Sequence, residues 1–340
     1  MSLSLRPGIY SSYEIRSSVI GSGRAALIGL AAAVTVQSAE AAEIQSLSEA
    51  AARFGADSSM AKLTRVLLLN GASKIFAVPV TDGDYASAFE RLMAEPGVAF
   101  MICDSRQLSV FGAMISAMED AGEASKYRLG IVEMGGTAVQ LTSAATAINN
   151  ERLVICGNCE PAGGAAGSVA AAVAAAAASC TDPAIPLNGV QLKGLSGLAY
   201  SFSDEDTEEL ISMGVTPVET AAGETCIVRA VTTRTMTDGQ ADASLRELNT
   251  MLVIDDVIPA VRSSLKEHFS RCRNNASSRA AIRTQVIVVL EEKLRRGTIE
   301  SYGDVTVRAD ESDPTVCLVS FGFAVAHGLS SICLEVCITV

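Results

Sequence analysis

The feature that most constrains the fold is a regular alternation of strand-like and helix-like runs through the first half of the chain. Short apolar runs such as "KIFAVPV" (74–80), "VAFMICD" (98–104), "YRLGIVEM" (127–134) and "RLVICG" (152–157) are separated by longer runs with helical character. An earlier apolar run, "RAALIGLAAAVTV" (24–36), is interpreted as a further buried strand followed by a turn. Strands that alternate with helices predict an α/β unit built on a mostly parallel sheet.

The pattern changes after about residue 182, where loops, longer helices and short alternating strands predict a separate α+β unit. "LNTMLVIDDVIPAVRSSLKEHFSR" (248–271) leads into one helix, and "NNASSRAAIRTQVIVVLEEKLRRG" (274–297) is a second that ends at Gly297. The second helix has an apolar stripe at helical spacing. Its members are Ile282, Val286, Val289 and Leu290. "DVTVRAD" and "TVCLVSFGFAVA" then alternate as strands.

The N-terminal residues have neither the apolar core nor the cleavage pattern of a secretory signal peptide. The nine cysteines are therefore expected to be reduced thiols in a protein made in the cytoplasm. The Ala-rich run 162–179 is too weakly apolar for a membrane span, so it is interpreted as a closely packed buried helix. We expect no membrane insertion.

Charge is unevenly distributed along the chain. The whole chain carries −12, which argues against general binding to nucleic acid or to anionic membranes. Residues 261–300 instead carry nine Lys and Arg against four Asp and Glu, a net +5 that leaves −17 for the remainder. A basic face on an acidic protein indicates a specific acidic partner surface.

Motifs that could carry chemistry are weak. Cys156 and Cys159 form a CxxC, but no second pair completes a metal shell, and a structural turn is the preferred interpretation over a redox pair. The Gly-rich stretches lack the GK[ST] of a phosphate-binding loop, and Gly163 and Gly164 are interpreted as close-packing positions. Asp255-Asp256 is interpreted as charge at a helix start. We therefore expect no enzyme activity, no cofactor and no metal.

The ends of the chain raise a different possibility. The last residues, "SSICLEVCITV", alternate with the period of a half-buried β-strand, and residues 1–22 are extended and poor in core residues. The apolar side of the terminal strand consists of Ile332, Leu334, Val336, Ile338 and Val340. Such ends either complete the chain's own last domain or exchange strands between subunits, which builds rings or filaments.

Several segments together resemble the contractile tail sheath proteins of phages and phage-tail-like bacteriocins. "RPGIYSSYEIRSS" resembles the opening arm of that family, with Pro7, Gly8, Ile9 and Tyr10 as its most specific part. "GETCIVRAVTTRT", the two closing helices, and "VTVRADESDPTVCLVSFGFAVAHGLSSICLEVCITV" resemble the last domain and the C-terminal arm. The resemblance covers the first twenty and the last hundred residues well and the middle weakly.

The resemblance implies an α/β plus α+β architecture, in which an outer α/β domain is inserted between N- and C-terminal segments that form an inner α+β domain with exchange arms. The implied divisions are an arm at 1–22, an outer domain at 23–225, a tube-facing inner domain at 226–329 and a strand arm at 330–340. Subunits would stack as hexameric rings around a tube and contract without nucleotide. A static filament or shell protein, and a small α/β enzyme with an unrecognised site, are the alternatives.

The implied partners are other copies of the chain, the inner tail tube protein, and baseplate and tail-terminator proteins, with no nucleic acid. The implied location is a phage tail or phage-tail-like particle, as part of a virion or a released particle. The candidate tube contacts are basic residues around the closing helices, where exposed charge pairs would hold the tube weakly. They are Arg271, Arg273, Arg279, Arg283, Lys293, Arg295 and Arg296.

Overall fold

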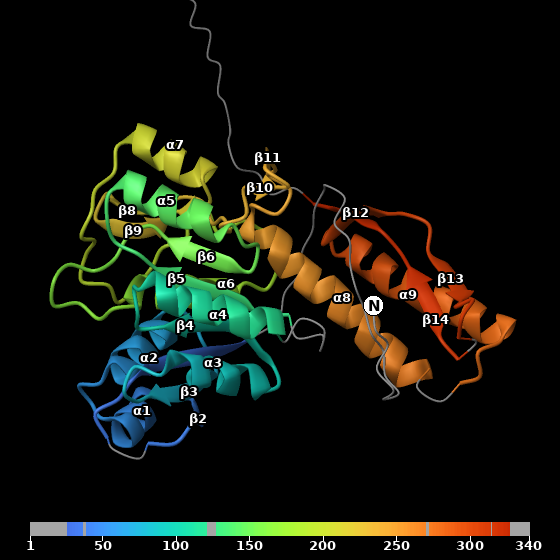
Figure 1. Ribbon diagram of the computed structural model, residues 1–340, viewed down its shortest axis with the longest axis horizontal. Helices are drawn as coiled ribbons and strands as arrows, with labels where there is room; N and C mark the ends of the chain where they lie inside the picture. Colours follow the sequence, from blue (N-terminus) through green and yellow to red (C-terminus); the bar gives the residue numbers. More distant parts are fainter. Residues whose placement is uncertain (1–25, 37–38, 121–126, 270–271, 314, 327–340) are drawn as a thin grey trace, which may run out of the picture.

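The computed structural model describes residues 26–36, 39–120, 127–269, 272–313 and 315–326. The predicted arms, residues 7–10 and 332–340, lie outside these residues, as does Arg271. The described chain forms an α/β unit joined through one long helix to a smaller α+β unit (Figure 1).

The α/β unit is built on a seven-stranded sheet with the order β2-β3-β1-β4-β5-β6-β7. All neighbouring strands are parallel except β2 and β3, which are antiparallel. The strands are β1 (Leu27–Ala33), β2 (Ala42–Ile44), β3 (Ile75–Val80), β4 (Val98–Cys103), β5 (Leu129–Glu133), β6 (Leu153–Cys156) and β7 (Val215–Thr216). The predicted α/β unit with a mostly parallel sheet is confirmed.

Helices cover both faces of this sheet. Alternate residues of each strand enter different cores, as Ile131 and Val132 do on β5, because successive side chains of a strand point to opposite faces. One face packs against α1 (Leu47–Phe54), α2 (Ser59–Leu69) and α6 (Ser168–Ser179). The other packs against α3 (Tyr85–Ala94), α4 (Leu108–Asp120), α5 (Ala138–Ile148) and α7 (Asp204–Ser212). Two small hairpins follow, β8 (Val218–Ala221) with β9 (Glu224–Ile227) and β10 (Met236–Thr237) with β11 (Gln240–Ala241).

Helix α6 is the Ala-rich run, and it is buried from Ser168 to Ala178, which confirms the predicted packed helix. Alanine side chains let the helix approach β4 and β5 closely. The glycine that makes this approach possible is Gly167, since a methyl group there would overlap the carbonyl oxygen of Cys103. Of the two glycines expected to allow close packing, Gly163 has no neighbouring atom within 4 Å of an added Cβ, whereas a Cβ on Gly164 would lie 2.4 Å from Cβ of Glu160. Among the described residues, no helix is long and apolar enough to cross a bilayer.

The smaller unit consists of two antiparallel helices and a long hairpin. Helix α8 (Leu248–Phe269) packs against α9 (Ala276–Arg295), and α9 covers the hairpin. The hairpin strands are β12 (Ile299–Tyr302), β13 (Thr306–Ala309), β14 (Cys317–Ser320) and β15 (Phe323–Val325). The predicted stripe on α9 is confirmed, because Ile282, Val286, Val289 and Leu290 are all buried in this core.

Helix α8 begins earlier than the sequence suggested. Asp255 and Asp256 were interpreted as charge at a helix start, but they lie about two turns into a helix that begins at Leu248 and continues through Pro259. The residues before them are buried, so tertiary packing extends the helix across a proline that usually marks a boundary. The two carboxylates therefore serve as ion-pair partners, not as a cap.

Gly167→Ala tests how tightly α6 is held against the sheet. Both Gly167 (φ +87°) and Gly163 (φ +101°) have backbones that an L-residue adopts with strain, but an added methyl group meets other atoms only at Gly167. We expect Gly167→Ala to lower the free energy of unfolding by about 2–5 kcal/mol, against roughly 1–2 kcal/mol for Gly163→Ala. Urea unfolding of both variants measures the difference, and equal losses would show that α6 has room to move.

Candidate functional site

The carboxyl edge of the parallel sheet is where proteins of this fold usually bind ligands. The chain passes from β1 to β3 on one side and returns to β4 on the other, so the switch point lies beyond β1 and β4. There, Asp104 accepts hydrogen bonds from the backbone N–H of Ala33 (2.9 Å) and from the hydroxyl of Tyr85 (2.7 Å). This carboxylate therefore joins β1, β4 and α3 within the chain.

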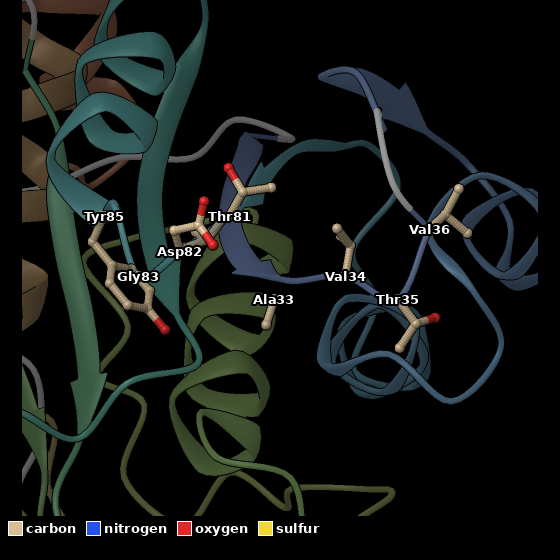
Figure 2. A pocket seen from close by; sticks show the side chains of 9 residues that line it. Ala33, Val34, Thr35, Val36, Thr81, Asp82, Gly83 and Tyr85 are labelled. Atoms are coloured by element: carbon tan, nitrogen blue, oxygen red, sulfur yellow. The ribbon is translucent and has the colours of Figure 1, made fainter.

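A shallow pocket of about 360 Å³ lies beside this point. Figure 2 shows Ala33 at the end of β1, with Val34 and Thr35 after it, on one side, and Thr81 and Asp82 after β3 on the other. Gly83 and Tyr85 complete the lining with Val36 and Val80. The Tyr85 hydroxyl donates its hydrogen bond to Asp104. Asp82 is the acidic residue among those that line the pocket.

A second carboxylate, Glu133 at the end of β5, occupies the N-terminus of α6. It is fully buried, and its Oε2 accepts from the backbone N–H of Val169 at 2.8 Å. Its Oε1 is 2.8 Å from Nε and 2.6 Å from Nη2 of Arg106. The helix N-cap, Gly167, offers no side chain of its own. A helix N-terminus attracts anions, so Glu133 places a carboxylate from within the chain where nucleotide-binding proteins with this type of sheet often hold a phosphate.

Burial raises the pKa of Glu133, while hydrogen bonds from Gly167 and Val169 and the ion pair with Arg106 oppose the rise. The carboxylate is thus held at a cost in solvation that its partners offset only in part. This is an arrangement that supports structure, with the charge directed at a helix end and not at an open cavity.

The CxxC belongs to the same edge. Cys156 ends β6, Cys159 follows in the turn, and both are buried free thiols. Burial raises the pKa of both, which keeps them protonated and weakly nucleophilic. Asn158 fixes the turn by donating to the carbonyls of Tyr200 and Val218, each at 3.0 Å. These contacts agree with a structural turn.

The basic residues of the smaller unit are divided among several environments. Arg273, Arg295 and Arg296 are exposed, and Arg296 pairs with Glu292 at 2.5 Å one turn earlier. Arg279 is half-buried and donates to Asn274 Oδ1 at 2.9 Å.

Arg283 is exposed and donates to the Val305 carbonyl at 2.8 Å, so it also ties α9 to the hairpin. Lys293 differs from the sequence expectation. It is only 8% exposed and forms an ion pair with Asp256 between α9 and α8, so it is not a surface charge of the subunit. The period of the helix cannot reveal a partner that lies 37 residues away in the sequence.

The hairpin presents open strand edges. In the described residues, β12 pairs with β15 and β13 with β14, and each pair forms a sheet of two strands. Phe321, Phe323 and Val319 on it are only partly buried. An isolated two-stranded sheet is marginally stable, and its outer N–H and C=O groups are available to another strand. This surface was not predicted from the sequence, although the short strands that form it were.

The described residues thus combine a doubly covered parallel sheet, with carboxylates bonded within the chain at its carboxyl edge, and a pair of helices that carries an open hairpin. Two family models match the chain, the phage tail sheath protein central domain over residues 79–233 and the phage tail sheath C-terminal domain over residues 240–339. The chain belongs to the phage tail sheath protein family. The matches agree with the resemblance found in the sequence.

Solved structures support the same fold at low sequence identity. The chain is similar to a protein in the contracted helical sheath of the anti-feeding prophage, with a TM-score of 0.74, 14% identity, and coverage of 98% of this chain and 99% of that chain. It is also similar to a chain in the six-fold symmetrised baseplate of the same particle, with a TM-score of 0.72, 13% identity, and coverage of 99% of this chain and 100% of that chain. A sheath tail protein from Desulfitobacterium hafniense matches with a TM-score of 0.68, 10% identity, and coverage of 94% of this chain and 100% of that chain. No curated protein matches this chain.

Glu133→Gln tests the carboxylate that fills the α6 N-terminus. We expect the variant to lose about 1–3 kcal/mol of unfolding free energy at low pH, because its amide NH2 group donates and cannot accept the hydrogen bond that a carboxyl oxygen accepts from Arg106 or Val169. The pKa of Glu133 is raised in the folded state, so the folded protein binds a proton there more readily than the unfolded chain. Its contribution to stability therefore falls as pH rises from its unfolded pKa of about 4.3.

The advantage of the wild type over Glu133→Gln should shrink as pH rises above that value, as measured by urea unfolding across a pH series. Glu205→Gln, on the exposed first turn of α7, is the control and should change little. An advantage that stays constant with pH would contradict the assigned shift.

Proposed function

We propose that this chain is the repeating subunit of a contractile sheath, stacked as six-membered rings around an inner tube. The observation that carries the proposal is the open-edged hairpin of β12–β15 in a chain that belongs to the sheath family. The similarity to a chain of a contracted helical sheath and to one of a six-fold baseplate supports it. The subunit would be made in the bacterial cytoplasm and assembled into a phage tail or phage-tail-like particle, between a baseplate and a tail terminator.

The subunits are joined by strand exchange in this proposal. The terminal residues 332–340 have the alternation of a strand about 30 Å long, and the segment around Pro7–Tyr10 is the second arm. A strand from a neighbour that pairs with an open hairpin edge gains main-chain hydrogen bonds and places its apolar side over partly buried residues such as Phe323. Each subunit gives and receives, which makes the contact heterologous and generates rings and helical stacks.

Contraction in this proposal uses no nucleotide. The anion position at the N-terminus of α6 is occupied by Glu133, and Asp104 at the switch point is bonded to Ala33 and Tyr85. The energy would instead come from two packings of the same subunits that differ in interface free energy. The joined arms keep the lattice connected while the subunit bodies move.

Electron microscopy of the subunit co-expressed with its tube protein tests the class of function. We expect sleeves around a tube in a long and a short form. Sleeves of one length under every condition would favour a static filament, and a protein that stays monomeric would contradict the proposal.

Replacement of the apolar side of the terminal strand tests strand exchange. Deletion of Ile332–Val340, or Leu334→Asp with Ile338→Asp, should leave a folded subunit that no longer forms sleeves. The matched control is Glu335→Ser with Thr339→Ser, on the opposite side of the same strand, which should assemble normally. Circular dichroism checks the fold, and microscopy counts the sleeves. Normal sleeves from the deletion would refute exchange through this segment.

We further propose that basic residues at the closing helices contact the tube. The candidates are Arg271, Arg273, Arg279, Arg283, Arg295 and Arg296, and the burial of Lys293 removes it from this set. Exposed ion pairs are worth only about 0–1 kcal/mol each, but many copies along a tube would set the register and still allow release. Arg279 and Arg283 are four residues apart on α9, so they lie on the same face of the helix.

Charge reversal tests this contact. Arg279→Glu with Arg283→Glu, and separately Arg295→Glu with Arg296→Glu, should reduce the extended sheath on its tube more than the contracted sheath. Arg53→Glu with Lys62→Glu, at exposed positions of the α/β unit, makes the same charge change as a control. Pelleting of sheath with tube at low and high salt measures the effect. If both reversals leave the extended form as abundant as wild type, the basic residues serve other contacts.

A further inference from the structure

Helix α8 belongs to both units of the molecule. Met251, Ile254 and Ile258 enter the core of the α/β unit, whereas Val257 and Val261 enter the core with α9 and the hairpin. Figure 1 shows α8 running between the two units. The orientation of one unit relative to the other therefore depends on how each unit packs against this helix.

The helix has a weak point near its middle. Pro259 has no backbone N–H, so the carbonyl of Asp255 lacks its usual helical donor. Prolines inside helices are the commonest sites of kinks. A helix that bends at this point would change the orientation of one unit relative to the other.

Side chains from the α/β unit hold α8 on both sides of Pro259. Before it, both oxygens of Asp255 accept from Nη1 of Arg152, at 2.7 and 2.6 Å. After it, the guanidinium carbon of Arg262 lies 5.6 Å from the centre of the Tyr127 ring. The guanidinium carbon of Arg152 lies 5.3 Å from the same ring centre, so one tyrosine contacts both cations. Asp255 and Arg152 side chains are only 17% and 14% exposed, which strengthens their attraction.

The opposite side of α8 is held by the smaller unit. Asp256 pairs with Lys293 on α9, and Ser264 accepts from Gln285 Nε2 at 2.8 Å. Adjacent residues of a helix point about 100° apart, so Asp255 and Asp256 reach different partners from one turn. Two neighbouring carboxylates thus tie the two units to the same point of the helix.

We infer that Tyr127, Arg152, Asp255 and Arg262 position the α/β unit relative to the α8–α9 unit, so that both units turn as one body when the sheath changes state. We call these four residues the joint. Two units connected by a single element otherwise move relative to each other. A rotation of the α8–α9 unit would then not be transmitted fully to the α/β unit. The role in contraction rests on the function proposed above, whereas the positioning of the two units does not.

Hydrogen exchange on the unpolymerised full chain tests the positioning. Arg152→Gln and Tyr127→Ala should each speed exchange of the amides at 252–262 by at least about tenfold, with little change in α9 or in β4 and β5. Tyr127→Phe keeps the ring under both guanidinium groups, although it loses the long hydrogen bond from Arg262 Nη2 to the tyrosine hydroxyl (3.5 Å), and it should exchange nearly like wild type. Arg53→Gln, which breaks an exposed pair on α1, is the control for loss of an arginine. Exchange that is unchanged, or that rises evenly through the α/β core, overturns the inference.

Contraction of assembled sleeves tests the consequence. Arg152→Gln and Tyr127→Ala should assemble extended sleeves in normal amounts but yield several-fold fewer fully contracted ones. The conservative variant Tyr127→Phe should contract as the wild type does. If wild type contracts and all variants contract equally, the joint has no role in the change of state. If wild type forms no sleeves at all, the proposed function fails, and the exchange experiment still decides whether the joint positions the two units.

Discussion

The arrangement of the whole molecule depends on the burial of helix α8 from two sides. One set of its apolar residues completes the α/β core and another completes the core with α9 and the hairpin. Because hydrophobic burial of a side chain contributes about 1.5–3 kcal/mol, neither unit can release the helix cheaply. Burial of α8 from both sides therefore fixes the position of the hairpin and of the basic residues relative to the sheet, although they belong to separate units.

At the carboxyl edge of the sheet, positions that often bind ligands in this fold are occupied by side chains of the chain itself. Doubly wound sheets leave helix N-termini and strand ends free to bind a ligand. Here Glu133 caps α6 from a neighbouring strand, and Asp104 joins two strands and a helix. The same physical features that bind a phosphate elsewhere are used here to connect strands and helices of the chain.

Most of the secondary structure could be predicted because it follows local sequence patterns. The strands β3 to β6 are short continuous apolar runs between helical segments, the stripe on α9 has helical spacing, and the Ala-rich run is too weakly apolar for a membrane span. Long-range partners could not be predicted in this way. Glu133 lies 36 residues from the helix that it caps, and Lys293 lies 37 residues from Asp256. The start of α8 was misplaced because Pro259 and two aspartates are locally typical of a helix boundary, and tertiary burial overrides that preference.

The open hairpin has a consequence for the life of a newly made subunit. Unpaired strand edges attract any extended chain, so a free subunit has a limited time before it joins either the correct lattice or an aggregate. The outcome is a competition between growth on a template and unguided association, which depends on concentration. In the function proposed above, the ratio of subunit to tube synthesis would then affect the yield of assembled sheath.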